Sequence, residues 1–168
     1  MGNDTLDGGL QNDDLYGGIG KDLILGGFGD DSALGEAGDD VIDGAGGDDT
    51  LYGFSSSYGY GEDRYVLASG GGRDRIVDYD PTAGNVDTVQ VASGILPAEV
   101  VLRREAASKS DLVIELAGTG DALVVDGWFS GSSYRVEELV FGDGTLWDLT
   151  VLAPAVTIMG TANAETIY

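Results

Sequence analysis

Apolar residues recur at a fixed nine-residue step through the first third of the chain. These positions are Leu6, Leu15, Ile24, Ala33, Ile42 and Leu51, and each is flanked by residues of variable type. Successive side chains of a β-strand point to opposite faces, so such a triplet predicts a short strand whose middle side chain points inward. The apolar pattern therefore predicts a stack of short strands, each of which contributes one side chain to the core.

Aspartate and glycine keep the same step. An Asp precedes each apolar residue by two positions, and a Gly follows it by two. The clearest copy, residues 17–25, reads Gly-Gly-x-Gly-x-Asp-x-apolar-x. Glycine tolerates positive φ and close backbone approach, so this segment predicts a tight loop before the strand. Two repeats, or 18 residues, then form one coil of a two-sheet solenoid.

The period also predicts where the carboxylates lie. Loops 18 residues apart stack on the same edge, which places Asp4, Asp22 and Asp40 in one column and Asp13, Asp31 and Asp49 in the other. Bare carboxylates about 5 Å apart, the spacing of neighbouring strands, repel one another. Divalent cations between successive loops would remove this repulsion. Carboxylate and carbonyl oxygens in a flexible loop favour calcium over magnesium.

Composition restricts the function further. The 168 residues include 30 Asp and Glu against 8 Lys and Arg, which gives a net charge of −22. This charge argues against binding to nucleic acid or to an anionic membrane surface. The chain has no Cys and no His, which excludes thiolate and imidazole metal ligands and catalysis that depends on either group. No apolar run is long enough to span a membrane, and no classical secretory signal is visible.

Neighbouring acids do not indicate an enzyme. Asp30 with Asp31, or Glu137 with Glu138, could in principle act as an acid and base pair. Two-carboxylate chemistry requires a cleft and one carboxyl group of raised pKa, which adjacent acids on a regular array do not predict. We therefore expect no catalytic residues.

The period is lost in the second half, which predicts a different architecture there. Residues 1–54 hold 13 of the acidic residues and 15 of the 29 glycines, whereas residues 84–168 hold four of the eight basic residues. Apolar and alternating stretches predict strands at 86–91, 100–104, 112–116, 122–125 and 134–141. Residues 142–145 predict a hairpin turn, and residues 96–99 predict one helical turn.

The nonapeptide resembles the RTX (repeats-in-toxin) family of secreted bacterial proteins, whose pattern is a known repeat signature. The match covers residues 2–53 and resumes at 61–66 and 72–77, after a break of phase over residues 54–60. The resemblance implies an all-β fold, a right-handed parallel β-roll, with calcium ions between stacked loops. Four to six ions are expected.

The resemblance also implies which residues bind calcium. Carboxylate ligands would come from Asp4, Asp13, Asp22, Asp31, Asp40, Asp49, Asp63 and Asp74. Backbone carbonyl ligands would come from the loops that contain Gly9, Gly18, Gly20, Gly27, Gly29, Gly38 and Gly47. Gln11, Glu36 and Ala45 depart from the glycine pattern. Carbonyl ligands tolerate such changes if the loop conformation survives.

The expected organisation has three parts. Residues 1–80 would form the calcium-binding roll, and residues 81–155 a β-rich capping domain similar to the non-repeat flank that follows RTX arrays. Residues 156–168 look like the start of a further repeat, with Glu165 in the Asp position. Both ends of the chain look cut, so neighbouring RTX blocks of the same protein are expected partners, together with calcium.

The resemblance implies a module that folds on calcium binding after secretion and is not itself an enzyme. Such a module would belong to a larger bacterial toxin, adhesin or exoenzyme that is exported by type I secretion. The alternative is an extracellular module that binds carbohydrate or protein and uses the roll as its scaffold. Under that alternative Trp128, Phe129 and Tyr134 would line a groove. Such aromatic residues more often belong to a core.

Overall fold

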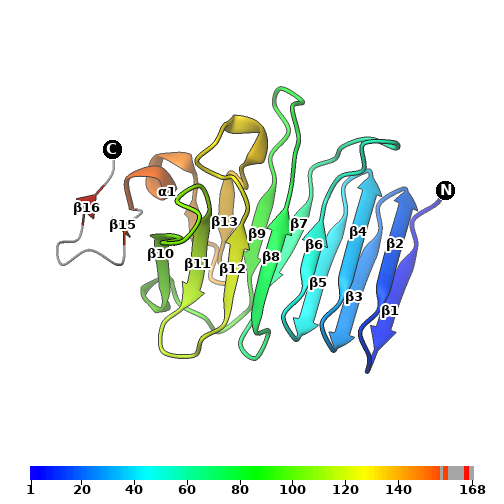
Figure 1. Ribbon diagram of the computed structural model, residues 1–168, viewed down its shortest axis with the longest axis horizontal. Helices are drawn as coiled ribbons and strands as arrows, with labels where there is room; N and C mark the ends of the chain where they lie inside the picture. Colours follow the sequence, from blue (N-terminus) through cyan, green and yellow to red (C-terminus); the bar gives the residue numbers. More distant parts are fainter. Residues whose placement is uncertain (156, 159–164, 167–168) are drawn as a thin grey trace.

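Each nonapeptide forms one strand and one tight loop, and alternate strands enter opposite sheets (Figure 1). The computed structural model describes residues 1–155, 157–158 and 165–166. One sheet contains β1 (Thr5–Gly9), β3 (Leu23–Phe28), β5 (Val41–Gly46), β7 (Arg64–Leu67) and β9 (Thr88–Val91). The other contains β2 (Asp14–Ile19), β4 (Ser32–Ala37), β6 (Thr50–Tyr52) and β8 (Arg73–Val77). These strands pair in parallel within each sheet.

The register follows the 18-residue coil. Leu6 lies beside Ile24, and Ile24 lies beside Ile42, so equivalent residues of the repeat stack directly on one another. Most strands of the repeat region are longer than the expected triplet, because the hydrogen-bonded ladder continues into the following glycines. The predicted parallel roll is confirmed.

One inward side chain per strand forms the core of the roll. Ile24, Ala33, Ile42 and Leu51 are fully buried, and Tyr65 and Ile76 continue the stack. Leu6 and Leu15 at the N-terminal end are only partly buried. The roll is therefore thin, and few apolar contacts hold each coil.

The second half adds strands to both sheets. β10 (Val100–Arg104), β11 (Leu112–Leu116) and β12 (Ala122–Val125) have the bounds that the sequence predicted. The strand expected at 134–141 is mostly wrong. Ser132–Tyr134 forms a 3₁₀ turn, and the strand β13 is confined to Glu138–Val140 before the hairpin to β14 (Leu146–Trp147). Pro97–Glu99 forms the expected helical turn, and the helix α1 (Leu149–Ala155) was not expected.

The two sheets continue past residue 80. β12 pairs in parallel with β8, and β13 pairs in parallel with β9. The complete orders are β1-β3-β5-β7-β9-β13-β14 for the seven-stranded sheet and β16-β15-β10-β11-β12-β8-β6-β4-β2 for the nine-stranded sheet. The division into a roll at 1–80 and a cap at 81–155 stays a prediction, since the cap extends the sheets of the roll.

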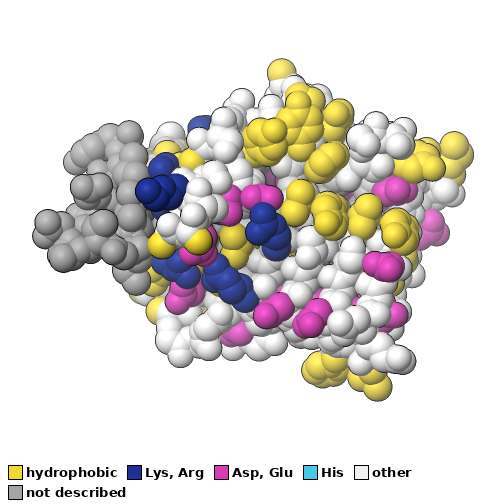
Figure 2. All heavy atoms as spheres, viewed as in Figure 1, with side chains coloured by type: hydrophobic (Ala, Val, Ile, Leu, Met, Phe, Trp, Pro, Cys, Tyr) yellow, Lys and Arg dark blue, Asp and Glu magenta, His cyan; other side chains and the backbone are white. Residues whose placement is uncertain are grey.

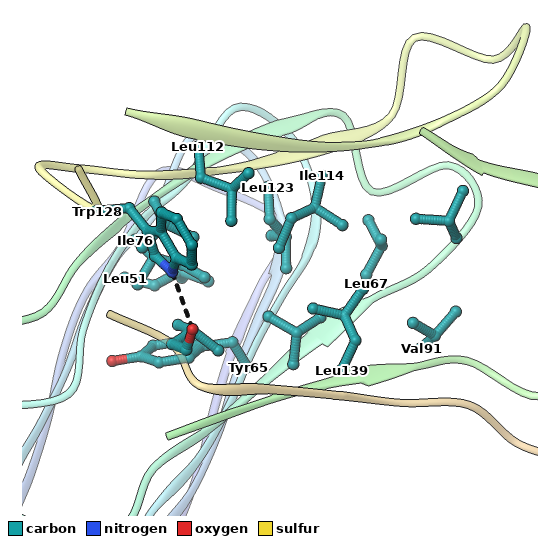
Figure 3. Close-up of a cluster of buried hydrophobic side chains, with 14 of the residues drawn as sticks. Leu51, Tyr65, Leu67, Ile76, Val91, Leu112, Ile114, Leu123, Trp128 and Leu139 are labelled. Carbon is teal, nitrogen blue, oxygen red and sulfur yellow. Dashed lines mark hydrogen bonds between the residues drawn. The ribbon is translucent and has the colours of Figure 1, made fainter. Parts of the chain in front are cut away.

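A larger core fills the space between the sheets at the cap. Leu112, Ile114 and Leu123 face Leu139 and Val91 across the two sheets (Figure 3). The side chain of Trp128 is 1% exposed, and its indole N–H donates to the carbonyl of Val136 at 2.9 Å. The core assignment of Trp128 is therefore confirmed, and this residue cannot line a groove. Bulky aromatic side chains here close the end of a roll whose nonapeptides each bury one aliphatic side chain.

The end of the chain is described in part. β15 (Thr157–Ile158) pairs in parallel with β10, and β16 (Glu165–Thr166) pairs antiparallel with β15. The further repeat expected at 156–168 falls largely outside the described residues. Within the described part of the chain, no helix is long and apolar enough to cross a membrane.

Candidate metal centres

The aspartates of the repeat form two columns along the loops, as the period predicts. In one column the backbone N–H of Asp4 donates to Oδ1 of Asp22 at 2.7 Å, and that of Asp22 donates to Oδ1 of Asp40 at 2.8 Å. In the other column Asp13 donates to Asp31 at 2.8 Å, and Asp31 donates to Asp49 at 2.7 Å. One carboxylate oxygen of each acceptor thus fastens its coil to the preceding one.

Both columns continue beyond the regular repeats. The N–H of Asp40 donates to Oδ1 of Asp63 at 2.9 Å, and that of Asp49 donates to Oδ1 of Asp74 at 3.1 Å. Asp63 and Asp74 therefore take up the column positions that the resemblance implied, across the break at residues 54–60.

Two further acids extend the first column and were missed by sequence reasoning. The N–H of Asp63 donates to Oδ1 of Asp87 at 2.8 Å, and that of Asp87 donates to Oε2 of Glu137 at 2.9 Å. Asp87 lies two residues before the inward Val89, so the Asp-x-apolar signature was present without its glycines. Glu137 has the same spacing before the inward Leu139, but with Glu in place of Asp and without the glycines, and β13 joins the stack only through the fold.

The second carboxylate oxygens have no partner. Among the described residues, Oδ2 of Asp13, Asp22, Asp31, Asp40 and Asp49 is buried and accepts no hydrogen bond. A buried polar atom without a partner is costly, and a buried charge costs more. Aligned oxygens of this kind fit a hard divalent cation, which prefers oxygen ligands.

The glycine-rich loops that carry the columns have positive φ, the conformation that the glycines were expected to allow. All seven glycines proposed to carry carbonyl ligands have positive φ, from 99° at Gly9 to 155° at Gly20. Glu36 and Ala45, which replace glycine in the pattern, also have positive φ, at 77° and 66°. The loop shape therefore survives these substitutions, at a cost of about 1–2 kcal/mol for each residue.

The first glycine of each repeat has a role that the sequence did not reveal. A Cβ atom on Gly17 would lie 2.6 Å from Oδ2 of Asp22. A Cβ atom on Gly26 would lie 2.5 Å both from Oδ2 of Asp31 and from the carbonyl oxygen of Gly44. This glycine is required because the carboxylate five residues later in the same repeat occupies the space of its side chain.

Where the roll meets the cap, Asp78 joins two acids of the first column in a group of three carboxylates. Asp63, Asp78 and Asp87 are each at most 3% exposed, and each offers a carboxylate oxygen within 4.8 Å of the others. The hydroxyl of the buried Tyr65 donates to Oδ2 of Asp78 at 3.0 Å. Asp78 follows β8 outside the nonapeptide pattern, so its place in this group could not be predicted from spacing.

Burial raises the pKa of these acids in the calcium-free fold. Desolvation, reinforced by neighbouring carboxylates, raises the pKa of Asp63 and of Asp87 to about 9. The same cause raises the pKa of Asp74 to about 8 and that of Asp78 to about 6. At neutral pH without a cation, Asp63, Asp74 and Asp87 therefore favour their protonated forms.

These shifts predict that acid stabilises the calcium-free fold. Since the folded pKa values lie above the ordinary value of 3.8, the folded chain holds more protons than the unfolded chain between about pH 4 and pH 9. The resulting stability is complete below about pH 4 and is lost as the pH rises through the folded values. In excess chelator, the β-sheet signal in circular dichroism should be stronger at about pH 5 than at about pH 8.

Acid should have the opposite effect on folding driven by calcium. Protons compete with calcium for the carboxylates, so the calcium concentration at the folding midpoint should rise as the pH falls. A signal that is independent of pH in chelator would contradict the burial of Asp63 and Asp87 in the calcium-free chain.

Comparisons with known proteins agree with this geometry. Residues 1–33 and 25–53 match the RTX calcium-binding nonapeptide repeat (4 copies), and residues 111–150 match the haemolysin-type calcium binding protein related domain. The chain is similar to the solution structure of the AlgE6R3 subunit from the Azotobacter vinelandii mannuronan C5-epimerase. The two are 27% identical with a TM-score of 0.51, over 81% of each chain. No curated protein matches the chain. The family resemblance and the β-roll are thereby confirmed.

Proposed function

Because residues 1–53 match haemolysin-type RTX calcium-binding repeats and residues 111–150 match a related domain, we propose that the chain is a module that folds on calcium binding after secretion. It serves as a structural and folding unit of a larger secreted bacterial protein. The observation that carries this proposal is the row of buried, unpartnered Oδ2 atoms in both Asp columns. RTX repeats are typical of secreted proteins.

The columns identify the residues that would hold calcium. Carboxylates from successive coils would share each ion with carbonyl oxygens of the glycine loops, and four to six ions would fill the array. At the junction with the cap, Asp63, Asp78 and Asp87 offer three oxygens close together in a buried place. Bound calcium would supply the positive charge that these acids lack. The row of ions would then extend beyond the nonapeptides into the cap.

Linkage between binding and folding provides the mechanism. In a cytosol with little calcium, a charge of −22 keeps the chain extended and ready for export. Outside the cell, millimolar calcium binds the folded columns and neutralises them, which matches the weak affinity of extracellular modules. The binding free energy of the ions is thus part of the folding free energy.

The cap covers the C-terminal end of the roll. An open solenoid end exposes apolar side chains and unpaired strands, so it requires a covering element. β12 and β13 pair with the last strands of the two sheets and bring the buried Trp128 and Phe141 with them. We propose that this part covers the last coil and starts its folding.

A non-catalytic role is part of the proposal. The repeat acids are committed to stacked columns, and the chain contains neither Cys nor His. The similar AlgE6R3 structure is one subunit of an epimerase, which supports a place as one module among others. The activity of the whole protein would then lie elsewhere.

The proposal is tested by removing two carboxylates of one column. Asp22→Ala with Asp40→Ala should raise the calcium midpoint of folding, because each side chain offers a buried oxygen without a partner. The measurement is circular dichroism during a calcium titration. The control is Asp7→Ala with Asp14→Ala, which removes the same charge from exposed positions on β1 and β2. Equal midpoints for the two variants would show that Asp22 and Asp40 are not ligands.

A further inference from the structure

We propose that the outer face of the nine-stranded sheet binds a linear, uncharged polysaccharide. The binding surface is an apolar row across four strands that leads into a cavity lined by aromatic rings. The row consists of Tyr16, Leu34, Tyr52 and Val77. This inference goes beyond the proposed function. It rests on that function only in so far as calcium-dependent folding forms the sheet that carries the surface.

The register of the sheet places the four side chains in line. Tyr16 lies beside Leu34, Leu34 beside Tyr52, and Tyr52 beside Val77. Each directly follows an inward core residue, so each points outward. Neighbouring strands are about 4.8 Å apart, which gives the row a length of about 14 Å. Tyr16 is 57% exposed, and Figure 2 shows hydrophobic side chains in a band across this face.

The row ends at a cavity of about 330 Å³. Val77 lines it together with Phe54, Tyr79 and Tyr134, so the last member of the row is also a wall of the cavity. The ring centroids of Tyr79 and Tyr134 are 5.1 Å apart, and those of Phe54 and Tyr79 are 6.0 Å apart. The apolar row therefore runs along the axis of the roll into a cavity of mixed character, where the aromatic rings stand beside the polar side chains of Ser110, Ser130 and Asp126.

The shape of this surface favours a thin ligand. The row is one side chain wide, whereas a stable protein interface requires about 800 Å² from each partner. β4, β6 and β8 are paired on both sides, so an extended peptide cannot add to them as a new strand. A linear chain of sugar rings needs neither a wide surface nor a free strand edge.

The chemistry of the surface suits sugar rings. A pyranose ring has C–H groups on its faces and hydroxyl groups around its edge, so it packs on an aromatic ring while its hydroxyls seek polar partners. Ser32 and Thr50 lie beside each other on this face, two residues before Leu34 and Tyr52. Their hydroxyls border the middle of the apolar row, and Asp14 and Arg75 hold the equivalent positions at its two ends. Tyrosine adds a phenolic hydroxyl to each ring that it offers.

Charge favours an uncharged ligand. Four to six bound calcium ions would reduce the net charge of −22 to between about −14 and −10, which still repels a polyanion. Arg75, which lies beside Thr50 on the same face, is paired with Asp126 at 2.7 Å, so its charge is already balanced. The aromatic contacts are therefore the main source of affinity on this face.

The test measures binding to the calcium-loaded protein by isothermal titration calorimetry. The probes are cellohexaose, laminarihexaose and mannohexaose, with polygalacturonate as the charged comparison. At least one neutral hexasaccharide should bind, and Tyr16→Ala with Tyr52→Ala should weaken it about tenfold, because each aromatic contact contributes modestly. Tyr52→Trp, which keeps an aromatic ring, should retain binding.

Leu25→Ala is the matched control. Leu25 has the same place in the repeat but lies on the seven-stranded sheet, so its loss should not change the affinity. Circular dichroism with calcium verifies that each variant is folded, which separates this proposal from calcium-dependent folding. Equal affinity of the double Tyr variant and the unchanged protein would overturn the proposal. Tighter binding of polygalacturonate, or no binding of any neutral probe, would also overturn it.

Discussion

Removal of calcium at neutral pH is expected to unfold the repeat region. Each coil buries few apolar side chains. The two columns bring carboxylates together, and among the described residues the Oδ2 atoms of five of these aspartates have no hydrogen-bond partner. A site filled at ten times its Kd contributes about 1.4 kcal/mol, so five sites contribute about 7 kcal/mol. This equals the whole stability of many domains. Circular dichroism in excess EGTA should show the loss of β-sheet signal, and added calcium should restore it.

Magnesium provides the control for the identity of the ion. Magnesium requires a small octahedral site and gives up its waters reluctantly, so it should restore the signal poorly. A chain that remains rich in β-sheet in EGTA at neutral pH would contradict calcium-dependent folding. Equal recovery with magnesium would contradict the assignment of calcium.

Gly26→Ala is expected to disrupt the roll even when calcium is abundant. The added Cβ would lie 2.5 Å from Oδ2 of Asp31 and from the carbonyl of Gly44, and neither group can withdraw without moving its own coil. Overpacking of this kind costs about 3 kcal/mol at its upper range. The displaced carboxylate would also lose its ion. Thermal unfolding in millimolar calcium should show a large decrease in Tm.

Gly46→Ala is the matched control in the same repeat region. Its added Cβ would lie 3.4 Å from the ring of Phe28 and farther from backbone atoms, in ordinary contact. This variant should keep a Tm near that of the unchanged protein. Similar losses in both variants would show that Gly26 is needed only as a flexible residue, and not to make room for the carboxylate.

Much of the roll could be predicted because the repeat imposes a single structure on every copy. The nine-residue step alone places Ile24 and Ile42 in the core and Asp22 and Asp40 in one column. It also locates the loop glycines with positive φ. Beyond the repeats, apolar runs still predict β10, β11 and β12. The same reasoning predicts a strand over 134–141, whereas the strand in the structure covers only Glu138–Val140.

The sequence by itself determined the period, the inward side chains and the two columns of aspartates, because these depend on spacing between near neighbours in a repeating coil. Only the tertiary structure decided that Asp87 and Glu137 extend one acidic column and that Asp78 lies beside Asp63 and Asp87. It also decided that Tyr16, Leu34 and Tyr52 lead into the cavity beside Tyr134. Glu137 lies 50 residues beyond Asp87. Contacts over such separations arise when the cap pairs with the last coils, and no local spacing encodes that pairing.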